Sequence, residues 1–176
     1  MIRFVLFGSL ELQDSTGAEL RSVLSQPKRT ALLAYLAAAE PRGWQRRDTL
    51  LALLWPEREE ERARAALSKA VHHLRRALGE DALESRGNEE LRLNPDLVWC
   101  DVAAFADALE AGEPERALAL YRGELLEGFH LSDAPEFERW LDAERARLKS
   151  RAQEAAWAAA KAAEQRGDVA TAVERA

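Results

Sequence analysis

The sequence has one cysteine, Cys100, among its 176 residues. A single thiol cannot form an internal disulfide, which fits the reducing cytoplasm. No apolar run approaches the roughly 20 residues that a membrane span needs, and Glu11 and Asp14 closely follow the short apolar start, which argues against a signal peptide. We therefore expect a cytoplasmic protein with no membrane contact. Its 47% hydrophobic content suffices for the core of one domain or two small ones.

The residue patterns of enzyme active sites are also missing. The sequence contains no Gly-rich phosphate loop, G-x-S-x-G elbow or Cys-His cluster. His72 and His73 are adjacent and point in different directions, so they cannot chelate a metal as an i, i+4 pair can, and His130 is distant in the sequence. We predict no catalytic residue, no metal and no cofactor, and ligand binding by the C-terminal half stays open.

The net charge of −6 is unevenly distributed. Residues 1–99 carry 15 basic and 15 acidic residues, whereas residues 100–176 carry 10 basic and 16 acidic residues. A surface for nucleic acid must therefore be a local patch in the first half. The acidic second half would repel phosphate, and we expect it to contact protein.

The segment 56–79 has the pattern of one long amphipathic helix. Acids stand at its start, neither Gly nor Pro interrupts residues 57–78, and Gly79 follows as a stop signal. At about 100° per residue, one side collects the apolar residues Ala63, Leu67, Ala70, Val71, Leu74 and Leu78. The other side collects Arg62, Ala65, Lys69, His72, His73 and Arg76. No acid occurs between residues 62 and 79, so this face suits a DNA major groove. A solvated helix explains the pattern equally well.

Residues 1–96 follow the order of a winged helix-turn-helix domain with an N-terminal antiparallel sheet. We expect strands at 2–8, 10–14 and 18–23, from their β-branched and aromatic content. Helices are expected at 27–40 and 48–55, with a small strand at 44–46, before the helix at 57–79. Segments 81–85 and 90–93 flank a Gly-Asn turn and predict a hairpin, the wing, at about 83–93.

Residues 97–176 form the predicted second domain, which begins after a seam at 94–96 and is helical throughout. The segments GEPERALALY, from Gly112, and GDVATAVERA, from Gly167, resemble each other at a spacing of 55 residues, longer than the 34 of tetratricopeptide repeats. Between them, residues 136–166 predict one or two long helices. We interpret this half as a tetratricopeptide-like domain, with a plain helical bundle as the alternative. Because Ala176 falls inside the second segment, we expect the chain to be part of a longer protein.

Residues 27–79, followed by LRLNPDLVWCDVAAF, closely resemble the SARP-type bacterial transcriptional activators. The most specific pieces are Leu54-Trp55-Pro56, LRRALG at 74–79, and Asp101-Val102 with Phe105; ALALYRGELLEGF at 117–129 marks the second domain. The resemblance implies an OmpR-like winged-helix domain followed by a bacterial transcriptional activator domain. It therefore implies a regulator that binds double-stranded DNA and activates transcription. Members of the family often carry additional domains.

The resemblance also implies roles for particular residues. Arg62, Lys69, His73 and Arg76, with His72 on the same face, would meet the major groove, and Arg86 would serve the wing. Relatives often have Arg or Lys where His73 stands, so the target sequence cannot be transferred. Glu57, Glu59, Glu60 and Glu61 lie where OmpR-like proteins contact RNA polymerase, although helix-dipole capping explains them as well.

Other side chains receive structural expectations. Trp55 should plug the core at the end of its helix, and Trp44, Trp99, Trp140 and Trp157 are assigned to packing. Arg75 lies nearer the core flank than Arg76, which favours a phosphate contact or an ion pair. With a weak basic patch per subunit, we expect a monomer that pairs on DNA sites about one helical turn apart. The rival hypothesis is a protein-interaction or scaffold module whose winged domain no longer binds DNA.

Overall fold

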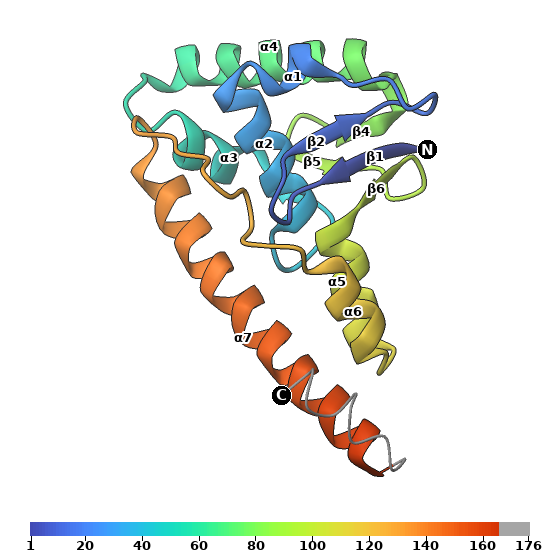
Figure 1. Ribbon diagram of the computed structural model, residues 1–176. Helices are drawn as coiled ribbons and strands as arrows, with labels where there is room; N and C mark the ends of the chain where they lie inside the picture. Colours follow the sequence, from blue (N-terminus) through green and yellow to red (C-terminus); the bar gives the residue numbers. More distant parts are fainter. Residues whose placement is uncertain (166–176) are drawn as a thin grey trace.

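The computed structural model describes residues 1–165 and has an α+β fold, as expected, with two small sheets and seven α-helices in that range (Figure 1). The first sheet contains β1 (Ile2–Val5), β2 (Glu11–Gln13) and β6 (Val98–Cys100) in the order β2-β1-β6. β1 and β2 are antiparallel, but β1 and β6 are parallel, with Ile2 opposite Val98. The sheet is therefore mixed. Its third strand, β6, comes from about 85 residues later in the sequence than β2.

The prediction of a strand at residues 18–23 is wrong. Only Glu19 bridges to Gln13, and the chain then forms the short helix α1 (Arg21–Leu24). The carboxylate of Asp14 accepts hydrogen bonds from the backbone N–H groups of Thr16 and Ala18, at 2.8 and 3.0 Å, which closes a tight turn. The helix that follows buries Val23 in the core.

Three longer helices follow at the positions expected. α2 (Pro27–Ala38) begins with proline at its first turn, α3 (Arg47–Leu54) ends before Pro56, and α4 spans Glu60–Leu78. α4 begins at Glu60 rather than near residue 57, because residues 57–59 continue the turn after Trp55 and Glu59 takes the N-cap position. Leu67 and Leu74 are 1% and 0% exposed on its inner face. Burial of each contributes about 1.5–3 kcal/mol.

The second sheet contains the hairpin. Its strands are β3 (Gln45–Arg46), β5 (Glu90–Leu93) and β4 (Leu83–Arg86) in the order β3-β5-β4, all antiparallel. A short 3₁₀ turn, Glu80–Ala82, links α4 to β4. Gly87 at the hairpin tip has a φ of +55°, which a glycine adopts without strain. The predicted hairpin is confirmed, and it lies directly beside the end of α4.

The helical half consists of α5 (Asp101–Glu110), α6 (Pro114–Leu120) and α7 (Pro135–Gln165). α5 and α6 pack against each other around the turn at Gly112, and α7 is one 31-residue helix, as the segment 136–166 suggested. The beginning of α7 packs against α3, and the helix then runs diagonally past α5 and α6 (Figure 1). The repeat-like segment that starts at Gly167 lies outside the described residues. Within residues 1–165, no helix has the length and apolar character needed to cross a membrane.

The two halves share one continuous core. The connection between α6 and α7 passes the residues that follow β1. There the Leu126 N–H donates to the Leu6 carbonyl at 2.8 Å, and the Gly8 N–H donates to the Glu124 carbonyl at 2.9 Å. Phe7 packs against Phe105, with ring centroids 5.4 Å apart. The expected boundary between residues 96 and 97 stays a prediction.

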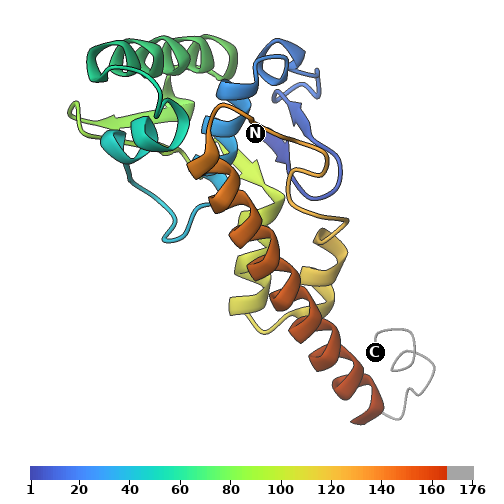
Figure 2. The ribbon, with the colours of Figure 1, turned by 90° about the vertical axis from the view of Figure 1, so that its left-hand side faces the viewer.

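The tryptophans only partly follow expectation. Trp55 is 4% exposed in the core, as predicted, and Trp140 packs on Tyr35 with ring centroids 4.8 Å apart. Trp157 is 70% exposed, so its assignment to packing is wrong. Trp157 belongs to the C-terminal part of α7, and this part of the helix extends beyond the first half, beside α5 and α6 (Figure 2).

Candidate nucleic-acid interface

The outward face of α4 is a basic surface on a helix whose other face is buried. Arg62, Lys69, His72 and Arg76 are exposed, interspersed with the small residues Ala65 and Ser68. The core holds Ala63, Leu67, Ala70, Val71 and Leu74, and Leu78 is half-buried. Small residues between the basic side chains let the helix approach a partner closely. α4 lies along one edge of the molecule, with nothing above it (Figure 1).

The positive charge of α4 is concentrated in its C-terminal half. Arg62 lies 4.0 Å from the carboxylate of Glu59, and Arg64 contacts Glu60 at 2.7 Å and Asp48 at 3.2 Å. Lys69 and Arg76, by contrast, form no ion pair with any residue in the range 1–165. The positive charges available to an anionic partner are therefore those of Lys69 and Arg76.

The two histidines differ in environment. Their ring centroids are 6.0 Å apart, His72 is exposed and His73 is half-buried. Burial lowers the pKa of His73 below 6.5, and the positive charges of Arg29, His72, Lys69 and Arg76 lower it further. His73 is therefore mainly neutral at pH 7. Residues 1–165 contain no cluster of His, Cys, Asp and Glu that could hold a metal ion.

The hairpin is fastened to α4 by Arg75. Its Nε and Nη2 donate to the Leu83 carbonyl at 3.0 and 2.9 Å, and Nη2 also donates to Ser85 Oγ at 2.8 Å. Within residues 1–165 Arg75 forms no ion pair, and its hydrogen bonds position β4. Its expected phosphate contact stays a prediction. Arg86 is 62% exposed near the hairpin tip, pairs with Glu90 at 3.2 Å and lies over the Trp44 ring at 4.3 Å.

The acids expected to contact RNA polymerase lie at the start of α4. Glu57 and Glu59 precede the helix, and Glu60 and Glu61 form its first turn; all four are exposed. Glu57 lies 3.8 Å from Arg58, and Glu59 and Glu60 pair with arginines of α4. These contacts and the helix dipole account for three of the acids structurally, whereas Glu61 forms no ion pair within residues 1–165. The contact with RNA polymerase stays a prediction.

Two arginines near α4, Arg29 and Arg47, were not predicted from the sequence to lie beside this helix. Arg29 of α2 lies close enough to act on His73, although it is remote in sequence. Arg47, at the start of α3, donates to Ser85 Oγ at 3.3 Å, while its buried Nε has no partner in the described part of the chain. Lys28, the neighbour of Arg29, instead pairs with Asp133 at 3.1 Å and donates to the Leu54 carbonyl. The local pattern of α2 contains no signal that separates Lys28 from Arg29.

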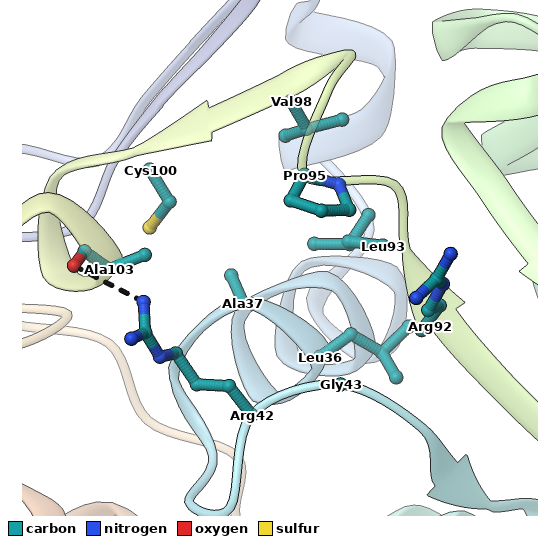
Figure 3. Close-up of a pocket in the computed structure, with 10 residues that line it drawn as sticks. All are labelled: Leu36, Ala37, Arg42, Gly43, Arg92, Leu93, Pro95, Val98, Cys100 and Ala103. Atoms are coloured by element: carbon teal, nitrogen blue, oxygen red, sulfur yellow. Dashed lines mark hydrogen bonds between the residues drawn. The ribbon is translucent and has the colours of Figure 1, made fainter. Parts of the chain in front are cut away.

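A separate cavity of about 330 Å³ lies between α2, β5, β6 and the start of α5 (Figure 3). Its wall is mostly apolar, with Leu36, Leu93 and Val98 among the lining residues. Its two guanidinium groups are already engaged. Arg42 pairs with Asp107 at 2.7 Å, and Arg92 pairs with Glu84 while lying over Trp44. None of the lining residues belongs to α4, so the cavity is not part of the basic surface.

Comparison with solved structures shows that the fold of the chain is similar to that of a transcriptional regulator. Its fold is similar to that of Mycobacterium tuberculosis EmbR, solved in complex with a low affinity phosphopeptide, with a TM-score of 0.58 and 26% sequence identity. EmbR is a SARP-family transcriptional regulator and not an enzyme. The similarity covers 92% of this chain and 48% of the EmbR chain, so the chain spans about half the length of EmbR. No family model and no curated protein matches the sequence.

Proposed function

We propose that the chain is a sequence-specific, double-stranded DNA-binding transcriptional regulator of the SARP type. α3 and α4 form its helix-turn-helix, α4 enters the major groove, and the β4–β5 hairpin is the wing. The observation that carries the proposal is the outward face of α4, where Lys69 and Arg76 have no acidic partner within residues 1–165, on a helix whose opposite face is buried. The similarity to the regulator EmbR supports the same function.

The remaining parts of the proposal follow from this role. Residues 1–96 are the DNA-binding domain, and residues 97–176 are a tetratricopeptide-like activator domain. The protein acts in the cytoplasm as an activator, and Glu57, Glu59, Glu60 and Glu61 contact RNA polymerase. In residues 1–165 the large exposed apolar side chains, Met1, Leu97 and Trp157, are few. This favours a monomer that pairs only on DNA.

A duplex titration tests the function directly. Binding-site selection from a randomised duplex pool yields the preferred sequence, and affinity is then measured at several salt concentrations. Contacts to about four phosphates predict a log–log slope of about −4 per monomer. A preference for one sequence that survives at higher salt supports base recognition by α4. No binding at low salt, or a slope near zero, would favour the protein-interaction module instead.

A further inference from the structure

The surface beside α4 is hollowed on the side of α1. The hollow has a volume of about 340 Å³. Its lining residues come from three helices: Ser22 and Val23 from α1, Arg29 from α2, and His73, Arg76 and Ala77 from α4. Three of the six can carry positive charge, and none is an acid. The hollow therefore differs from the apolar cavity of Figure 3 in both place and charge.

The charges of this hollow are not neutralised. Within residues 1–165, neither Arg29 nor Arg76 forms an ion pair. Glu19, the acid that precedes α1, is held by Arg21 at 2.7 Å and does not line the hollow. Two guanidinium groups and an imidazole thus line the hollow, and no carboxylate lines it.

The lowered pKa of His73 has the same origin, because positive side chains surround its ring. After burial, its causes are the positive charges of Arg29 on α2 and of His72, Lys69 and Arg76 on α4. α1 adds only Ser22 and Val23 to the lining. A field that disfavours an imidazolium favours an anion at the same place.

The position of the hollow fits one strand of a bound duplex. In Figure 2, α1 lies on one side of α4, and the β4–β5 hairpin lies below α4 on the other side. A major groove about 12 Å wide has a phosphate backbone along each edge, so a helix seated in it has one backbone on either side. The hairpin with Arg86 faces one edge, and the hollow faces the other.

We propose that Arg29, His73 and Arg76 form a phosphate-binding site that holds one backbone phosphate of duplex DNA on the α1 side of α4. This inference rests on the proposed function. The two guanidinium groups provide the charge and donate N–H groups to the phosphate oxygens, and the His73 ring donates a further hydrogen bond. α2 thereby contributes Arg29 to an interface otherwise built from α4 and the hairpin.

The test measures duplex affinity of the full chain against salt for three variants. R29Q should weaken binding about tenfold and make the log–log slope shallower by about 0.9. R29K keeps the charge and should retain most of the slope. R116Q is the matched control: Arg116 lies on α6 and pairs with Glu113 at 2.7 Å, so affinity and slope should not change. If the unaltered chain binds DNA and R29Q behaves as R116Q does, the inference is wrong and the proposed function stands.

A second measurement follows the His73 ring by NMR, with H73Q to assign its signals. Bound duplex should raise the pKa of His73 in the unaltered protein, and an unchanged pKa would overturn the site even if R29Q failed to fold. Inorganic phosphate, titrated against chloride at equal ionic strength, distinguishes a free anion from DNA. If phosphate raises the His73 pKa while no duplex binds at low salt, the hollow is a free-phosphate site. That outcome overturns both the duplex assignment and the proposed function.

Discussion

Asp101 joins the two halves through one buried carboxylate, and its replacement by asparagine should loosen that junction. The side chain is 3% exposed. Oδ1 accepts hydrogen bonds from the N–H groups of Leu6 and Val102, both at 2.9 Å, and Oδ2 accepts one from Phe7 at 2.9 Å. Leu6 and Phe7 directly follow β1, whereas Val102 lies in the first turn of α5. The carboxylate thus connects the N-terminal sheet to the helical half.

The loss of unfolding free energy in D101N can be estimated from the number of hydrogen-bond acceptors that remain. Asparagine replaces one oxygen with an amide NH₂ group, so in either orientation a donor faces the N–H of Phe7 or of Val102. A buried N–H that loses its acceptor costs about 1–3 kcal/mol. For a chain of this size, a loss of about 2 kcal/mol lowers the melting temperature by roughly 4–8 °C. Urea and thermal unfolding at pH 7 measure both quantities.

A control on the same helix makes the Asp101 test selective. Asp107 is an exposed acid of α5 that pairs with Arg42 at 2.7 Å, so D107N removes a surface ion pair alone and should cost less than about 1 kcal/mol. If D101N is no more destabilising than D107N, the carboxylate does not hold the halves together. An intact fold with the same unfolding free energy would refute the hydrogen-bond argument.

The pH dependence of Asp101 provides a further check. Burial raises its pKa above the usual 3.8, and the backbone hydrogen bonds only partly oppose this. Because the folded-state pKa exceeds the unfolded one, this contribution to stability is complete below about pH 3.8 and is lost as the pH rises through the folded-state pKa. The stability difference between the native protein and D101N should therefore be larger near pH 4 than near pH 7.

Three further predictions concern α4. Lys69→Ala should leave the fold intact and make the salt slope of DNA binding shallower by about one; if both Lys69→Ala and Arg76→Ala leave affinity and slope unchanged, α4 does not enter the groove. Binding should tighten as the pH falls below about 6.5, because a nearby phosphate raises the lowered pKa of His73, and the trend should vanish in the His72→Gln/His73→Gln variant. Leu74→Ala empties a fully buried site and should cost roughly 2–5 kcal/mol in urea unfolding, with DNA binding lost only as the protein unfolds.

Local patterns predicted the parts of the fold that depend on nearby residues. The long helix and its buried face follow from apolar periodicity, and the hairpin follows from the Gly-Asn turn between two short strands. The mixed first sheet could not be predicted in this way. β6 pairs with β1 across nearly the whole first half of the chain. Such long-range pairing depends on the packed helices between the strands, and no single segment carries its signal.

The same distinction applies to the candidate interface. The neutralisation of Arg62 and Arg64 could have been predicted, because Glu59 and Glu60 stand three and four residues before them, the spacing at which helical side chains meet. The meeting of Arg29 with His73 could not, because it depends on how α2 packs beside α4. Periodicity thus identifies the face of a helix, whereas packing of other elements decides which charges surround it.

The charge distribution along α4 restricts how the helix can approach DNA. Its first turn carries Glu60 and Glu61, and the guanidinium groups of Arg62 and Arg64 are paired with Glu59 and Glu60. That end has no surplus positive charge to offer a phosphate. From Lys69 onward the exposed ionisable side chains are all basic until the helix ends, and the hollow with Arg29 lies beside this part. Because phosphate contacts fix the position of a protein on a duplex, the C-terminal half of α4 should lie against the backbone. The acidic start is then directed away from the phosphates, where repulsion is weakest and a second protein can reach it.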